Sequence, residues 1–501
     1  MNFISPLYAV FLLSVLVIYW SVPNEKLRWW TVLIASLVFY GSLDIKYIPL
    51  LLVLTGINFR LGLEIGSNTT QGEYVIDWQL SNQEWLFAQA DWNRRRLKLL
   101  WLGVSLNVLL LLSFKYLSGL LKYIFHLDIT SPNSGFKLIA PLGISFFTFE
   151  CIAYLVDVYR GATASTQFLK FATYKLFFPK LISGPITRYH SLASQFYKLQ
   201  FPSVEKVTEA LWLISQGAVK KGILADNLGI FVDLCFGNLQ RAGSVDLWLA
   251  TFAYGLQLYL DFSGYVDIAR GTALLFGLVL PENFDFPYFS TSIAEFWRRW
   301  HMTLGDWLRN YLYFPLGGSR QGLVRTCWNL FIVMLIAGIW HGSAWGFIVW
   351  GVFHGLALGV HRLTEAMGNR LGEKFWVHFW QNPFGIFTAW VLTQLMIFTA
   401  WIWFRLPNLQ DSAWVFQHLW GHAADVQFVE KVYVEALNMQ PYQLTCLLGI
   451  LAIVMSVIYL FKAKLQLEFN WPVKLVFVPL CFYAVWILAP EGGLPYIYFD
   501  F

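Results

Sequence analysis

Long apolar stretches without charge recur along the whole chain. Residues 7–20 (LYAVFLLSVLVIYW) and 99–114 (LLWLGVSLNVLLLLSF) are two examples, and neither contains a charged side chain. They approach the roughly 20 residues that a helix needs to cross a bilayer, and they lack the alternation of barrel strands. Lipid offers no partner for open backbone groups, so such stretches predict membrane helices. The apolar runs lie near residues 4–22, 29–43, 47–59, 99–125, 138–156, 172–187, 208–235, 244–263, 268–280, 327–361, 384–405, 444–462 and 471–489.

The fold class predicted from these runs is an all-α, polytopic membrane protein. Some runs are short enough to be re-entrant and others long enough to be double, so we expect roughly 10–13 membrane helices or re-entrant segments. Composition agrees with this, because 57% of the 501 residues are hydrophobic and 13% are charged. A typical soluble domain carries about twice that share of charge.

The charges around the first helix predict the orientation of the chain. No basic residue precedes the first apolar run and no small-x-small cleavage site follows it before Pro23, so we expect a retained helix rather than a signal peptide. Lys26 and Arg28 follow the run, which places that short loop inside. After two more crossings the chain returns inside at Arg60, ahead of the basic stretch NRRRLK at residues 93–98. The chain is therefore predicted to start outside, with its basic loops in the cytoplasm.

Two polar inserts interrupt the apolar pattern, at residues 64–92 and 407–440. The second contains His418 and His422, whose i, i+4 spacing can place two metal ligands on one helix face. The chain has no HExxH sequence and no obvious third ligand, so we interpret this pair as part of a solvated helix face and predict no metal site. The helix count leaves open on which side of the membrane residues 407–440 lie.

Two histidines stand in unusual surroundings. His301 lies in the polar, aromatic segment EFWRRWHMTLGDWLRNYLYFPLGGSR, and His341 lies in the apolar run LFIVMLIAGIWHGSAWGFIVWG. Ionisable groups at membrane depth are costly and usually face a cavity or a partner. Small residues, Gly338 and Gly342, surround His341 and leave room either for a closely packed helix or for a substrate atom. A packing histidine and a functional one are both compatible with this context.

The segment at residues 295–320 is too polar to cross lipid and too aromatic to be a free loop. It predicts an amphipathic, partly buried element at a membrane interface, ended by the turn PLGGSR. The alternative is an anchor whose arginines extend towards lipid phosphates. The arginines and indoles on which this prediction rests are Arg298, Arg299, Arg309, Trp297, Trp300 and Trp307.

Charged residues also occur inside several apolar segments. Because a buried charge must find a partner, we expect these groups to form ion pairs between segments; a proton or substrate path is the alternative. The residues are Glu150, Asp157, Lys175, Lys180, Asp261 and Asp267. No GxSxG, P-loop or Rossmann sequence is present, and the aromatic-basic mix lies in a membrane context, so no nucleic-acid partner is predicted.

Several segments together resemble the signature region of the membrane-bound O-acyltransferase family. These are YLDFSGYVDIARG, LPENFDFPY, FWRRWHMTLGDWLRNYLYFPLGGSR and GIWHGSAWGFIVWGVFHG, which occur here in that order. The likeness is greatest to the bacterial branch of alginate O-acetylation and teichoic acid D-alanyl transfer. PLGISFFTFECIAYLVDVYRG, FFPKLISGPITRYHSLASQF and the tail PYIYFDF extend the resemblance over most of the chain. That branch usually carries Asp where this chain has Asn310, so a carboxylate role there does not carry over.

The resemblance implies a single membrane acyltransferase domain over residues 1–501 in a bacterial inner membrane. Its parts would be N-terminal helices at 1–125, a signature core at 138–362 and C-terminal helices at 384–501. A ring of helices would surround a central funnel, which an acyl donor enters from the cytoplasm and an acceptor hydroxyl from the other side. The family's two functional histidines correspond to His301 and His341.

Chemistry gives these histidines distinct expected roles. A neutral imidazole can remove the proton of an attacking hydroxyl, so His341 is predicted to be the general base. His301 would orient the acceptor or stabilise the oxyanion. Residues predicted to contribute to the donor or acceptor site are Trp297, Arg298, Trp300, Arg309 and Trp340.

No bound cofactor is predicted. Acetyl-CoA or another acyl thioester would be the co-substrate. The acceptor would be an exported polysaccharide or another compound with a hydroxyl group. The partners expected besides the bilayer include an extracytoplasmic, esterase-like acetyltransferase. Three alternatives remain open: D-alanyl or other acyl transfer from a carrier protein, a transporter, and a non-catalytic relay that feeds such a partner.

Overall fold

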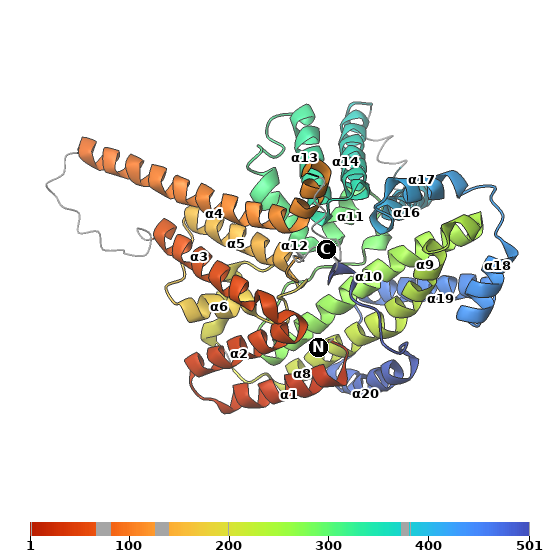
Figure 1. The fold of residues 1–501 in the computed structure, drawn as a ribbon, viewed down its shortest axis with the longest axis horizontal. Helices are drawn as coiled ribbons and strands as arrows, with labels where there is room; N and C mark the ends of the chain where they lie inside the picture. The colour runs from red at the N-terminus through yellow and green to blue at the C-terminus, as the bar shows by residue number, and fades with distance from the viewer. Residues whose placement is uncertain are drawn as a thin grey trace. The chain divides into compact units, whose positions relative to one another are not determined.

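The computed structural model describes residues 1, 3–66, 82–125, 140–198, 200–371, 380 and 382–499. Within these ranges the regular structure is helical and no strand occurs, which confirms the all-α prediction. The middle of the first polar insert, residues 67–81, lies outside the described residues. The chain forms two compact units, Met1–Val207 with Thr272–Pro281 and Thr208–Gly271 with Glu282–Phe501, which we call unit 1 and unit 2. Figure 1 labels the helices and colours them from red at the N-terminus to blue at the C-terminus.

Unit 1 is built from the N-terminal helices. Its helices are α1 (Pro6–Ser21), α2 (Glu25–Asp44), α3 (Ile48–Gly66), α4 (Asn82–Phe125), α5 (Ile144–Tyr159), α6 (Phe168–Leu176) and α7 (Tyr189–Ala193), with short turns η1 (Ile45–Tyr47) and η2 (Gln195–Lys198). The helices α3 and α5 approach closely at Gly62, where an added Cβ would lie 2.3 Å from the ring of Tyr154.

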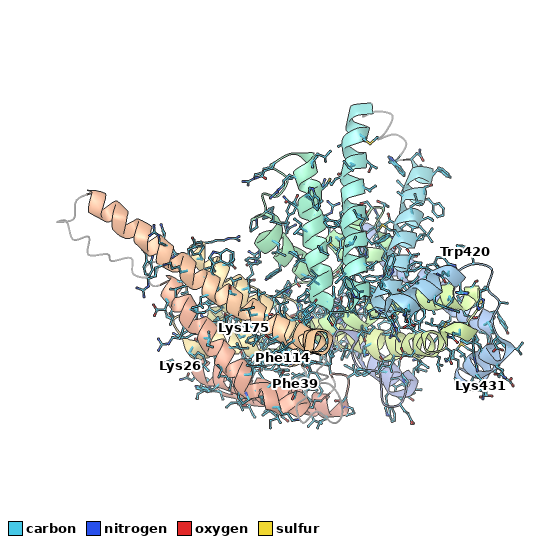
Figure 2. The ribbon with its side chains drawn as sticks, turned by 45° about the horizontal axis from the view of Figure 1, so that its top comes forward. Lys26, Phe39, Phe114, Lys175, Trp420 and Lys431 are labelled. Atoms are coloured by element: carbon cyan, nitrogen blue, oxygen red, sulfur yellow. The ribbon has the colours of Figure 1, made fainter. Side chains whose placement is uncertain are left out.

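A buried ion-pair cluster lies inside unit 1. Glu150 of α5 accepts hydrogen bonds from Lys180 at 2.7 Å and from Lys175 at 3.1 Å. The backbone N–H and the hydroxyl of Thr187 donate to the same carboxylate at 3.0 and 2.9 Å. Lys175 lies among the helices of this unit (Figure 2). The predicted pairing between these apolar segments is therefore confirmed.

Unit 2 contains the remaining helices and the C-terminal tail. Helices α8 (Val204–Ala218) and α10 (Ser244–Leu275) have most of their residues here. The others are α9 (Asp226–Phe236), α11 (Ile293–Arg299), α12 (Met302–Leu308), α13 (Leu323–His341), α14 (Trp345–Leu371), α16 (Pro383–Arg405), α17 (Leu409–His418), α18 (Val426–Phe428), α19 (Pro441–Tyr459) and α20 (Trp471–Leu488).

Shorter helical segments join or extend the helices of unit 2. Four have π-helical bonding: η3 (Val219–Ala225), η6 (Arg309–Tyr313), η7 (Val429–Ala436) and η8 (Leu460–Lys464). Three are 3₁₀ turns: η4 (Leu239–Arg241), η5 (Pro287–Phe289) and η9 (Ile497–Phe499). After η6 the chain turns as predicted, because Gly317 and Gly318 adopt positive φ of 103° and 58°.

Seven segments of the described chain are long and apolar enough to cross a membrane: Glu25–Gly66, Trp92–Leu117, Leu323–His341, Trp345–Gly368, Pro383–Arg405, Pro441–Lys464 and Trp471–Leu488. The first of them comprises two helices, α2 and α3, which η1 joins. The multi-pass prediction is confirmed by these segments, and the predicted total of membrane segments stays a prediction.

The helices α13 and α14 form a tight hairpin in unit 2. A Cβ on Gly338 would lie 2.4 Å from the carbonyl oxygen of Phe347, so the two backbones approach as closely as glycine allows. His341 ends α13 directly beside this contact, which fixes the depth at which its ring enters the unit.

Candidate active site

The two histidines singled out in the sequence line one buried cavity of unit 2. Its volume is about 20 Å³, and its walls include His301, His341, Trp297, Trp300, Trp350 and Tyr498. The His301 side chain comes from the junction of α11 and α12, and His341 comes from the end of α13. A volume of this size holds about one water molecule, so side chains must move before an acyl group and a hydroxyl can meet here.

His301 is held in an unusual backbone conformation. Its φ of 43° lies in the left-handed region, which costs a non-glycine residue of order 1–3 kcal/mol. Hydrogen bonds to Asn283 offset this conformational cost where α11 joins α12. Its carbonyl accepts from the N–H of Met302 at 2.9 Å, and its Oδ1 accepts from the N–H and the hydroxyl of Thr303 at 3.0 and 2.8 Å.

The same Asn283 oxygen indicates which nitrogen of His301 carries the proton. The backbone N–H of Thr303 can only donate, so the Asn283 atom that it meets is the oxygen. His301 Nδ1 lies 3.3 Å from this oxygen and must donate to it. In the neutral ring Nε2 is then the hydrogen-bond acceptor.

Burial keeps His301 neutral. The ring is 1% exposed, and burial lowers its pKa from 6.5 to about 3. The stability that this shift implies is fully present above pH 6.5 and is lost as pH falls towards 3, because the unfolded chain then binds the proton more readily.

We expect Asn283→Ala to lower both stability and activity. The change leaves the buried N–H and hydroxyl of Thr303 without their acceptor, at a cost of about 1–3 kcal/mol, and it releases the ring of His301. Thermal unfolding of the detergent-solubilised protein and acyl-transfer kinetics measure the two effects. Asn227→Ala, at an exposed asparagine of α9, is the matched control; equal losses in both variants would contradict the positioning role of Asn283.

His341 is surrounded by aromatic rings. It is 5% exposed, and its ring centroid lies 4.7 Å from Trp340, 4.9 Å from Phe404 and 5.2 Å from Trp350. These rings exclude water from the imidazole on several sides. An electrostatic interaction in such a site is stronger than in water.

The other predicted site residues divide into two groups. Trp297 and Trp300 line the cavity, and Trp340 contacts the ring of His341. Arg298 is exposed, and Arg309 forms an ion pair with Asp306 at the surface of α12. Neither arginine lines the cavity, so their predicted contact with the donor would have to lie outside it.

Tyr498 of the C-terminal tail is a cavity residue that the sequence analysis did not single out. Its ring stacks on Phe262 of α10 at 3.9 Å, and its centroid lies 6.1 Å from His301 and 6.2 Å from His341. The sequence signal for it is the aromatic ending PYIYFDF, which resembles the family's C-terminal ending but assigns no role to a single residue.

A buried charge cluster holds this tail in place. Lys221 of η3 pairs with Asp226 at 2.7 Å and with Asp261 at 2.6 Å. Its Nζ also donates to the carbonyl of Pro495 at 3.1 Å, and Asp261 accepts from the N–H of Ile497 at 2.9 Å. We call Lys221, Asp226 and Asp261 the tail anchor. Asp261 is thus ion-paired, as expected for a buried charge, but its partner Lys221 lies outside the segments between which pairing was predicted.

Two further histidines, His354 and His418, do not line the cavity. His354 packs fully buried against Trp350 and Trp297, at 4.8 and 5.2 Å between ring centroids. His418 donates through Nδ1 to the carbonyl of Trp414 at 2.8 Å. No cluster of three His, Cys, Asp or Glu side chains within the described residues could hold a metal ion.

Comparison with known sequences bears on this site. A profile of the membrane-bound O-acyltransferase family matches residues 84–401, a range that includes both histidines. The probable alginate O-acetylase AlgI of Pseudomonas aeruginosa is 37% identical over 418 residues, which are 83% of this chain and 74% of the relative.

Two further relatives carry other names. The peptidoglycan O-acetyltransferase of Helicobacter pylori is 36% identical over 419 residues, 78% of this chain and 73% of that protein. The teichoic acid D-alanyltransferase of Streptococcus thermophilus is 30% identical over 242 residues, 46% of this chain and 58% of that protein.

Proposed function

Because the chain belongs to the membrane-bound O-acyltransferase family, we propose that it transfers an acetyl group from a cytoplasmic thioester, acetyl-CoA, to a hydroxyl of an exported polysaccharide in a bacterial inner membrane. The chain is a multi-pass membrane O-acyltransferase. The relatives support acetyl as the acyl group, since two O-acetylating relatives match over most of the chain and the D-alanyl relative matches over less than half.

One observation carries the catalytic part of this proposal. His301 and His341, which are distant in sequence, line the same buried cavity. A pair of imidazoles in a water-poor cavity is suited to moving a proton off a hydroxyl.

The proposed reaction is a direct transfer. The acceptor oxygen attacks the thioester carbonyl while His341 takes the hydroxyl proton; the C–S bond then breaks and the thiolate leaves, taking up the proton from the imidazolium. No side-chain nucleophile is required. The aromatic rings around His341 keep water from competing with the acceptor.

Of the two roles expected for His301, orienting the acceptor is the one that its hydrogen bonds support. With the proton on Nδ1, the Nε2 lone pair can accept from an acceptor hydroxyl. Stabilising an oxyanion would require a proton on Nε2, and the lowered pKa of His301 opposes a doubly protonated ring.

The experiment that tests this proposal is a measurement of O-acetyl groups on exported polysaccharide. We expect a deletion strain to lose ester-linked acetate and the wild-type gene to restore it, and we expect purified protein to release CoA from acetyl-CoA when acceptor is present. Ester-linked acetate that is unchanged by deletion would refute the donor or the acceptor class and favour D-alanyl transfer from a carrier protein. Acetate that depends on the gene without CoA release by the purified chain would instead favour a relay to an extracytoplasmic partner.

A further inference from the structure

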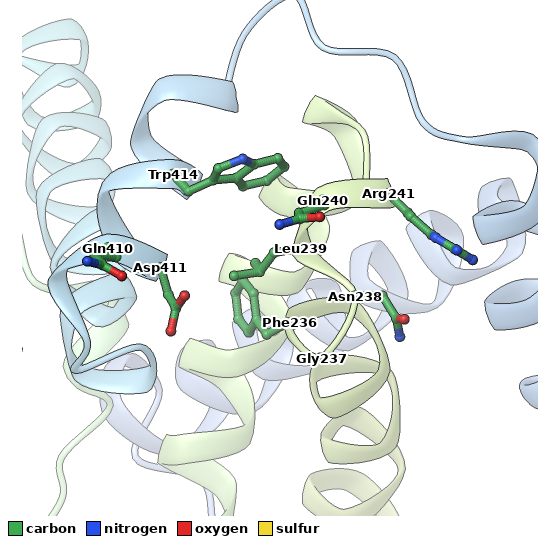
Figure 3. Close-up of a pocket in the computed structure, with 9 residues that line it drawn as sticks. All are labelled: Phe236, Gly237, Asn238, Leu239, Gln240, Arg241, Gln410, Asp411 and Trp414. Carbon is green, nitrogen blue, oxygen red and sulfur yellow. The ribbon is translucent and has the colours of Figure 1, made fainter.

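A second pocket lies in unit 2, between α17 and the turn that follows α9. Its volume is about 540 Å³, within the range of small-molecule sites. Its lining includes Trp414, Asp411, Gln410, Gln240, Arg241 and Asn238 (Figure 3). None of these residues lines the cavity of the two histidines. We call it the α17 pocket.

The side chains of the α17 pocket suit a sugar ring. The C–H face of a pyranose packs on an aromatic ring, and its hydroxyls donate to and accept from planar polar groups such as carboxamides and carboxylates. Trp414 supplies the ring on one wall. Gln240 lies opposite it, and Asp411 is on the same helix as the indole (Figure 3).

The indole of Trp414 is held before any ligand arrives. His418 stacks on it at 4.0 Å with an interplanar angle of 18°, and the His418 ring is itself fixed by its bond to the carbonyl of Trp414. His418 does not line the pocket, so the pocket is bordered by a part of the indole that His418 leaves uncovered. An aromatic surface fixed in this way loses little conformational entropy on binding.

The charges of the α17 pocket favour a neutral sugar. Within the part of the chain that the structure describes, Asp411 has no basic group at ion-pair distance. Arg241 points away from Trp414 (Figure 3) and lies 3.4 Å from Gln427. The insert 407–440 carries four carboxylates, Asp411, Asp425, Glu430 and Glu435, against one lysine, Lys431. A polyuronate would meet like charge here.

The helices of unit 2 indicate on which side of the membrane the pocket lies. The N–H of Gly346, at the start of α14, donates to the carbonyl of Pro407 just after α16 at 2.9 Å, so these two helix ends meet beside the α17 pocket. Towards their opposite ends α13 and α14 carry Arg325 and Arg362, and η8, which continues α19, carries Lys462. The end of α16 beside the pocket carries Arg405, whose charge is balanced by an ion pair with Asp233 at 2.6 Å. Basic residues mark the cytoplasmic ends of membrane helices, so the α17 pocket faces the extracytoplasmic side.

We propose that the α17 pocket binds a neutral pyranose unit of the acceptor polysaccharide on the extracytoplasmic side. This inference rests on the proposed function in one respect, namely that the bound saccharide is the acceptor of the transferred group. Binding of a saccharide at the pocket can be tested without any acyl transfer. A polysaccharide bound at this pocket would be kept near the membrane surface, which raises the effective concentration of its other sugar units at the same protein.

The test is a binding titration with full-length protein in detergent. The probes are neutral hexamers of glucose, mannose and N-acetylglucosamine and a hexamer of mannuronate. We expect saturable binding of at least one neutral hexamer, weaker binding of the uronate, and a loss of about tenfold or more in Trp414→Ala. Gln240→Ala removes an exposed loop side chain and keeps the test valid if Trp414→Ala does not fold. Trp420→Ala, at an exposed indole of the same insert (Figure 2), should bind like the wild type.

The inference is overturned if no hexamer binds, or if a hexamer binds equally well to wild type, Trp414→Ala and Gln240→Ala. A uronate that binds more tightly than every neutral hexamer would also overturn it, because the charge argument would then be wrong.

His341→Ala separates this inference from the proposed function. If that variant binds saccharide normally and retains acetyl transfer, the catalytic proposal fails and the α17 pocket stands. If His341→Ala loses acetyl transfer while the pocket variants bind saccharide like the wild type, the α17 pocket proposal fails and the catalytic proposal stands.

Discussion

His341→Ala is expected to lower acyl transfer by about 10²–10⁴-fold, the contribution of a positioned general base. The reason is that the change removes the imidazole at the end of α13 from the cavity, while the remaining imidazole, His301, is proposed to orient the acceptor rather than to take its proton. The loss should appear in kcat, because the proton moves only in the chemical step. CoA release by purified protein and O-acetyl content of the exported polymer, at matched membrane levels, measure it.

The matched control for His341 is His361→Ala. His361 lies on α14, outside the cavity, and interacts with Glu365 at 3.4 Å, so its loss should change transfer by less than about twofold. His341→Gln keeps a polar side chain of similar size and should be nearly as inactive. Near wild-type transfer by His341→Ala, with normal membrane levels, would remove His341 from the mechanism and leave a packing role.

Lys221→Met is expected to destabilise unit 2 by about 3–5 kcal/mol, the cost of breaking a buried ion pair on one side. Lys221 and its partners Asp226 and Asp261 are each no more than 2% exposed at the side chain. The substitution leaves two carboxylates buried without their cation and removes a donor to the tail at Pro495. Tyr498 would then no longer be fixed in the cavity, so activity should fall together with the midpoint of thermal unfolding.

Lys220→Met provides the control at the neighbouring position. Lys220 pairs with Asp267 at 2.6 Å, but its side chain is 29% exposed, so water can replace much of the interaction and the loss should be about 1 kcal/mol. Equal unfolding midpoints for the two variants would contradict the tail anchor. Tyr498→Ala tests the link to the cavity, since it should lower transfer while the anchor and most of the stability remain.

The resemblance and the local context of the sequence brought His301 and His341 to attention, and the structure places both at one cavity. The sequence could not indicate Asn283 as the residue that holds His301, because its role depends on a backbone turn at residues 300–302 that no periodicity predicts. The sequence likewise did not indicate Lys221, which lies in an apolar helical segment. Its structural role depends on ion pairs with Asp226 and Asp261 and on a hydrogen bond to the C-terminal tail.

The sequence by itself determined the all-helical membrane architecture, because the length and apolarity of each run are local properties that lipid converts directly into helices. It also determined which segments carry unusual chemistry, since ionisable groups in apolar runs stand out without any knowledge of packing. Only the tertiary structure decided which of these groups meet. Cavity walls, the tail anchor and the α17 pocket each combine residues from distant segments, and such contacts depend on how helices pack rather than on the order of residues in any one of them.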